Sequence, residues 1–178
     1  MGFPELLLAR RRAILDDWLD RIVRTYPESM GGYLRKGRDP FGNPLGGTLA
    51  EGVEAVFDAM LDGADAAELS MALDRTVRLR AVQAFRPAEA VGYVFELKKS
   101  VRKALKSDLK KGRYADELAA FDARVDEVAL VAFDVYTSCR ERLMKIRSNE
   151  ARNLARNLLE RAGLSFPGSS FEERGTTS

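Results

Sequence analysis

The sequence predicts an all-α fold, a five-helix bundle completed by a long C-terminal helix. Apolar residues recur at three- and four-residue steps over most of the chain, and glycine and proline gather between these periodic segments. No stretch shows the strict apolar–polar alternation of a half-buried strand. Hydrophobic residues make up 46% of the 178 residues, which allows one domain with a real core.

The first helix is expected from Pro4 to Tyr26, where Pro27 ends it. Its apolar stripe consists of Leu7, Ile14, Leu15, Trp18, Ile22 and Tyr26. Residues 27–47 are rich in glycine and proline, so this segment is predicted to be a long loop. A second helix is expected from Thr48 to Leu61, because Thr48 and Glu51 have the spacing of a capping box.

Two further helices are expected at residues 66–84 and 87–107, since Pro87 suits the first turn of a helix. The apolar stripe of the fourth helix is Val91, Val94, Phe95, Val101 and Leu105. The fifth helix should run from Tyr114 to Arg161, which contains neither proline nor glycine. At about 1.5 Å per residue it would be ~70 Å long, more than one small domain can cover.

This length sets the predicted domain organisation and assembly. Residues 1–113 would form the bundle, residues 114–163 would complete it and project or dimerise, and residues 164–178 would be a disordered polar tail. We therefore expect a homodimer through helices. The candidate dimer or redox seam is Val135, Cys139, Leu143 and Ile146. A buried, inert thiol is the alternative interpretation of Cys139.

The composition excludes much catalytic chemistry. The chain has no histidine and one cysteine, so a histidine-based triad, a Cys–His pair and a histidine-ligated metal or haem are excluded. We expect no enzyme activity, metal or cofactor. A net charge of +2 argues against a nucleic-acid partner, and no apolar run is long enough for membrane insertion. Without an export signal or paired cysteines, the expected location is cytoplasmic.

Two stretches could carry binding chemistry. The first is the proline-rich loop from Arg38 to Leu49, where Asp39, Phe41 and Asn43 are candidate ligand- or partner-binding residues. The alternative is a rigid loop that buries Phe41 in the core.

The second stretch lies at the end of the third helix, where Arg80 and Gln83 are candidate ligand-binding residues. Arg75 and Arg78 lie nearby, and the four side chains together could capture an anion. Helix capping and a tight helix–helix corner are the alternative explanation.

Charge is also segregated along the chain. Eight basic residues against one acidic residue, Asp108, lie between Lys98 and Arg113. The following stretch, Asp116 to Asp134, is strongly acidic. The acidic stretch could neutralise the basic one within the fold or across a dimer.

The segments DPFGNPLGG and RAVQAFRPAEAVGYVFELKKSVRKAL resemble the N-terminal domain of RsbT co-antagonist proteins of bacterial stressosome-type signalling, the RsbRD-type N-terminal domain. The resemblance covers roughly residues 6–105. It implies a helical, globin-like, non-haem sensor that passes a signal through a C-terminal helix. This sequence has a polar tail where those proteins have a phosphorylatable domain, so phosphorelay is not implied and the resemblance is to a stand-alone form.

A second resemblance involves DVYTSCRERLMKIRSNEAR, residues 134–152, which is similar to small proteins encoded beside membrane redox complexes of sulfite reduction. The leading hypothesis is a non-enzymatic, haem-free signalling sensor or adaptor that relays ligand or partner binding through its long C-terminal helix. The alternative is an accessory scaffold subunit that docks on a membrane redox complex of sulfite reduction.

Overall fold

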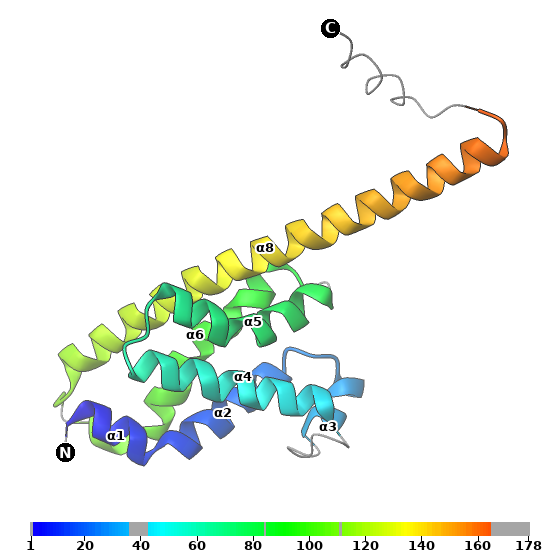
Figure 1. Cartoon of the computed structure of the whole chain (residues 1–178). Helices are drawn as coiled ribbons and strands as arrows, with labels where there is room; N and C mark the ends of the chain where they lie inside the picture. The colour runs from blue at the N-terminus through cyan, green and yellow to red at the C-terminus, as the bar shows by residue number, and fades with distance from the viewer. Residues whose placement is uncertain (1, 36–42, 84, 111, 165–178) are drawn as a thin grey trace, which may run out of the picture. The chain divides into compact units, whose positions relative to one another are not determined.

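The computed structural model describes residues 2–35, 43–83, 85–110 and 112–164. Within these ranges the protein is all-helical (Figure 1). The helices are α1 (Phe3–Ala9), α2 (Arg11–Val23), α3 (Glu28–Arg35), α4 (Pro44–Leu61), α5 (Ala66–Val82), α6 (Pro87–Ala104), α7 (Lys106–Leu109) and α8 (Ala115–Arg161). The chain forms two compact units, Met1–Cys139 and Arg140–Ser178.

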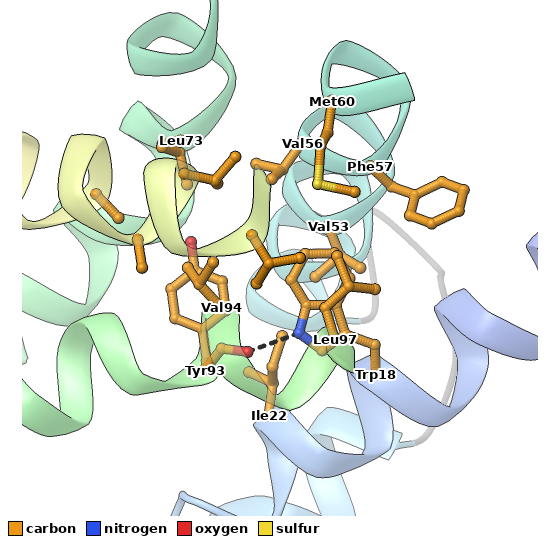
Figure 2. Close-up of a cluster of buried hydrophobic side chains, with 14 of the residues drawn as sticks. Trp18, Ile22, Val53, Val56, Phe57, Met60, Leu73, Tyr93, Val94 and Leu97 are labelled. Atoms are coloured by element: carbon orange, nitrogen blue, oxygen red, sulfur yellow. Dashed lines mark hydrogen bonds between the residues drawn. The ribbon is translucent and has the colours of Figure 1, made fainter. Parts of the chain in front are cut away.

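The first unit is built on two helix pairs. α4 packs against α5, α2 packs against α6, and contacts between α2 and α4 join the pairs. Trp18 lies at the centre, fully buried, and its indole Nε1 donates a 2.7 Å hydrogen bond to the main-chain oxygen of Tyr93 (Figure 2). The rings of these two residues stack with centroids 6.2 Å apart. The indole N–H therefore connects α2 to α6 through the core.

The first predicted helix is two helices in the structure. α1 ends at Ala9, and Arg10 leaves helical geometry with φ −106° and ψ 6° before α2 begins. The loop predicted for residues 27–47 is also partly wrong, because α3 forms inside it. Leu34 of α3 is buried, so tertiary packing stabilises a helix that the glycine content disfavours.

α4 begins one turn earlier than the sequence predicts. Asn43, not Thr48, is the N-cap, and its side chain accepts a 2.9 Å hydrogen bond from the Gly46 main-chain nitrogen. Pro44 occupies the first helical turn, where its missing N–H costs nothing. A Cβ at Gly46 would lie 2.3 Å from the Asn43 amide, so glycine is required for this cap.

The part of α8 in the first unit buries one face against the bundle. The buried residues are Phe121, Val125, Val128, Ala129, Ala132, Val135, Tyr136 and Cys139. Asp126 pairs with Lys98 at 2.6 Å, and Asp122 pairs with Arg102, so the acidic stretch neutralises part of the basic stretch within the chain. One core assignment is wrong: Phe95 is 44% exposed, while Leu97 of the same helix is buried.

In the second unit, the helical residues Arg140–Arg161 are exposed or half-buried. Of the predicted tail, only Leu164 lies within the described residues, so the expected disorder there stays a prediction.

Candidate functional site

The candidate site is built around Arg80, in the last turn of α5. Its side chain is fully buried, which is unusual for arginine. Its Nη2 donates to the Thr25 hydroxyl at 3.0 Å and to the Glu89 main-chain oxygen at 2.8 Å. The guanidinium thus joins the end of α2 to the first turn of α6.

Three aromatic rings surround the guanidinium. Arg80 Cζ lies 4.2 Å from the ring centroid of Phe85, 5.3 Å from that of Tyr26 and 5.4 Å from that of Tyr93. The Tyr26 and Phe85 rings also meet edge to face at 5.1 Å. Cation–π contacts stabilise a buried cation by about 0.5–2 kcal/mol each. Because stacking uses the faces of the guanidinium, its edge N–H groups stay available for hydrogen bonds.

Several buried polar atoms of this cluster have no hydrogen-bond partner in the described part of the chain. They are Arg80 Nε and Nη1, the hydroxyls of Tyr26 and Tyr93, and Gln83 Oε1. An unpaired buried polar group costs about 1–3 kcal/mol, and native structures contain few of them. We call these four residues together with Phe85 the Arg80 cluster.

The charge of Arg80 also lacks a counterion among the described residues, because no carboxylate in them forms a salt bridge with it. Glu89 acts on Arg80 electrostatically, but its exposed carboxylate is paired with Arg86 at 2.7 Å. Burial lowers the pKa of Arg80, and the nearby tyrosines oppose that change. Burial likewise raises the pKa of Tyr26 and of Tyr93, while the Arg80 cation lowers both. Arginine stays protonated in proteins, so the cluster carries one buried positive charge.

A hollow of about 450 Å³ adjoins the cluster at Tyr26. Its lining consists of Val23, Arg24, Tyr26, Glu28, Gly31 and Gly32, from α2, α3 and the turn between them. Tyr26 therefore contacts both the hollow and Arg80. The volume is in the range of small-molecule sites.

The cluster is also connected to α8 within the first unit. The Tyr136 hydroxyl donates a 2.7 Å hydrogen bond to the main-chain oxygen of Phe85. The Phe85 nitrogen in turn donates to the main-chain oxygen of Arg80 at 3.2 Å. Two hydrogen bonds therefore connect the backbone that carries Arg80 to the C-terminal helix, through which the family resemblance implies that a signal passes.

The structure separates the four side chains predicted at the end of the third helix. Arg75 is exposed and pairs with Glu51 at 2.9 Å, and Arg78 is exposed and pairs with Asp74 at 2.8 Å. Arg80 is buried in the cluster, and Gln83 is half-buried with its Oε1 atom buried there. Of the predicted loop residues, Asp39 and Phe41 lie outside the described residues, and Asn43 is buried as the cap of α4.

The residues of the predicted seam have different environments. Val135 and Cys139 are each 8% exposed, covered by their own chain, whereas Leu143 is half-buried and Ile146 is 53% exposed. Their role at a dimer interface stays a prediction. Sequence reasoning missed Tyr26, Phe85 and Tyr93 as site residues, because aromatic residues on apolar helix faces are indistinguishable from ordinary core.

Residues 2–35, 43–83, 85–110 and 112–164 carry neither a metal centre nor a membrane-spanning helix. These residues contain no group of three or more acidic or cysteine side chains placed to hold a metal ion. No helix in the same ranges is long and apolar enough to cross a bilayer.

The fold and the site define an all-α domain with a cationic, aromatic-lined cluster in its core. The sequence matches the RsbT co-antagonist protein rsbRD N-terminal domain over residues 12–151, and the chain belongs to that family. A protein of Archaeoglobus fulgidus, described as uncharacterized, is 26% identical over 143 residues, which cover 79% of this chain and 83% of the relative. No solved structure matches the chain.

Proposed function

We propose that the protein is a haem-free sensor domain of stress signalling that relays ligand binding at the Arg80 cluster through α8. The family supports a regulatory role in stress signalling. The observation that carries the proposal is a buried Arg80 that forms no salt bridge with any described residue and whose backbone is hydrogen-bonded, through Phe85, to Tyr136 of α8.

The relay depends on the corner between α5 and α6. A ligand that pairs with Arg80 stabilises the arrangement in which the guanidinium lies 4.2 Å from the Phe85 ring. That arrangement fixes the Phe85 carbonyl, which accepts the Tyr136 hydroxyl. Ligand binding then shifts the equilibrium between two arrangements of the corner, and with it the packing of α8. The shift cannot exceed the difference between the ligand's affinities for the two arrangements.

Hydrogen exchange tests the relay without knowledge of the ligand. Arg80→Met removes the charge and keeps much of the side-chain volume. We expect it to change amide exchange in α8 around Tyr136. Arg75 is an exposed residue of α5, like Arg80 a member of that helix, and Arg75→Met should leave amide exchange in α8 unchanged. In a Tyr136→Phe background the effect of Arg80→Met on α8 should disappear. Identical α8 exchange in the wild type and Arg80→Met would refute the relay.

Native mass spectrometry of freshly purified protein supplies the complementary measurement. A retained small molecule that is lost in Arg80→Met supports sensing. The same spectra report assembly, and a dimer at micromolar concentration supports the proposed homodimer. A single-chain mass under these conditions contradicts it.

The second candidate function, docking on a membrane redox complex of sulfite reduction, is favoured by a different observation. In the first unit α8 exposes two large apolar side chains, Leu130 at 69% and Phe133 at 50%. Such residues can form the centre of a protein interface. Co-purification with a respiratory complex, lost in a Leu130→Ser, Phe133→Ser variant, supports docking. Co-purification that survives these substitutions argues against this surface.

A further inference from the structure

We propose that the Arg80 cluster binds a small monocarboxylate with a compact apolar body, an inference that rests on the proposed sensing function. The ligand carboxylate would occupy the position of the missing counterion and accept hydrogen bonds from Arg80, Tyr26 and Tyr93.

The buried positive charge of Arg80 favours an anionic ligand. Isolated ions are costly to bury, and a buried arginine is ordinarily paired with a carboxylate or a phosphate. Arg80 is fully buried, and its hydrogen bonds go to a hydroxyl and a main-chain oxygen, both of them neutral. Water molecules could satisfy the unpaired N–H groups but would leave the charge uncompensated. An anionic ligand satisfies both requirements.

The hydrogen-bond donors of the cluster favour a ligand with a single negative charge. Nη2 is used by Thr25 and Glu89, so Nε and Nη1 are the guanidinium nitrogens without a partner in the described chain. The hydroxyls of Tyr26 and Tyr93 supply two further donors. One cation with several neutral donors matches a monoanion, whereas a sulfate or phosphate dianion would leave a second charge buried without a partner.

The aromatic surroundings of the cluster favour a carboxylate with an apolar body over an inorganic anion. The walls are the rings of Tyr26, Phe85 and Tyr93, which offer hydrocarbon surface beside the donors. Of the cluster residues, Tyr26 also lines the neighbouring hollow, whose volume of about 450 Å³ is compatible with a small organic acid. Gln83 Oε1 adds one unpaired acceptor, which can receive a hydrogen bond from a hydroxyl or amide of the ligand.

Calorimetry and thermal unfolding of the whole chain test the proposal with defined probes. The probes are sodium acetate, propionate and benzoate, with propionamide as the neutral analogue of propionate and sodium sulfate at equal ionic strength as the dianion. We expect propionate or benzoate to raise the melting temperature in a saturable manner, and propionamide and sulfate to leave it unchanged.

Variants assign the binding to the cluster. Arg80→Met should weaken carboxylate binding by at least about 100-fold, and Tyr93→Phe by about 10-fold, because each removes hydrogen bonds to a charged group. Tyr93→Phe should fold as well as the wild type, because its hydroxyl has no partner in the described chain. Arg75→Met, on the exposed side of the same helix, should bind like the wild type.

The outcomes separate the two proposals. Absence of saturable binding by any of the carboxylates, equal binding of propionamide, or full affinity in Tyr93→Phe would overturn the ligand class. If carboxylate binds and α8 exchange does not respond, the site is real and the relay is wrong. If Arg80→Met alters α8 exchange and no carboxylate binds, the relay stands and the ligand class is wrong.

Discussion

Asp17 holds α2 and α6 together through a network whose contribution to stability can be measured against pH. Its carboxylate accepts hydrogen bonds from Arg21 at 2.6 Å, from the Ser100 hydroxyl at 2.8 Å and from Lys103. Burial raises the pKa of Asp17, but the hydrogen bonds from Lys103, Arg21 and Ser100 outweigh burial and lower the pKa from 3.8 to about 2. The folded state therefore favours the ionised form.

The magnitude follows from linkage. Each pKa unit corresponds to about 1.4 kcal/mol, which gives an upper limit of roughly 2.5 kcal/mol. The Asp17 side chain is 13% exposed but its partner Lys103 is 68% exposed, so solvent screening reduces the expected value to about 1–2 kcal/mol. Because the folded pKa lies below the unfolded one, this stability is present above about pH 4 and is lost as pH falls toward 2.

The assay is urea unfolding of the wild type and Asp17→Asn at several pH values between 7 and 2. Asp17→Asn should lower the free energy of unfolding by about 1–2 kcal/mol at pH 7, and the difference should shrink to near zero at pH 2. Asp16→Asn, with its 54% exposed side chain on the same helix, is the matched control and should have little effect. A difference between the wild type and Asp17→Asn that is equal at pH 7 and pH 2 would refute the electrostatic explanation.

Two further substitutions test local features of the fold. A Cβ at Gly52 would lie 2.0 Å from the Thr76 hydroxyl oxygen, so Gly52→Ala should be neutral or destabilising in the wild type. In a Thr76→Ala background the same substitution should stabilise the protein by about 1 kcal/mol, because a helix interior favours alanine over glycine by that amount. A thermal-unfolding double-mutant cycle measures this, and additive effects contradict the close contact. Asn43→Ala removes the α4 cap and should cost about 1 kcal/mol by urea unfolding, whereas an unchanged midpoint would mean that the cap is replaceable.

Much of the architecture was predictable because it depends on local patterns. The spacing of Leu69, Leu73 and Val77 defines the buried face of α5, and Pro87 correctly marks the start of α6. The start of α4 was not predicted, because the capping-box spacing of Thr48 and Glu51 is a local signal, whereas the use of Asn43 as the cap depends on its buried contacts. One of these is a 3.1 Å hydrogen bond from its side chain to the main-chain oxygen of Leu34.

The site was predictable only in part, for a physical reason. Arg80 lies in an arginine-rich turn, and the sequence singles out that turn without showing which arginine is buried. Burial of Arg80 depends on where α5 meets α2 and α6, through contacts such as the one to Thr25, 55 residues away in sequence. The aromatic residues of the cluster carry no local signal that distinguishes them from core residues.

The bond between Tyr136 and Phe85 has a consequence for how such a domain could diversify. Tyr136 donates to a main-chain oxygen, which every amino acid at position 85 would supply. This hydrogen bond therefore depends on where the corner lies and requires no particular side chain at position 85. In the proposed relay, substitutions at Tyr26 or Tyr93 would alter ligand recognition while the hydrogen bond from Tyr136 to the corner stays in place.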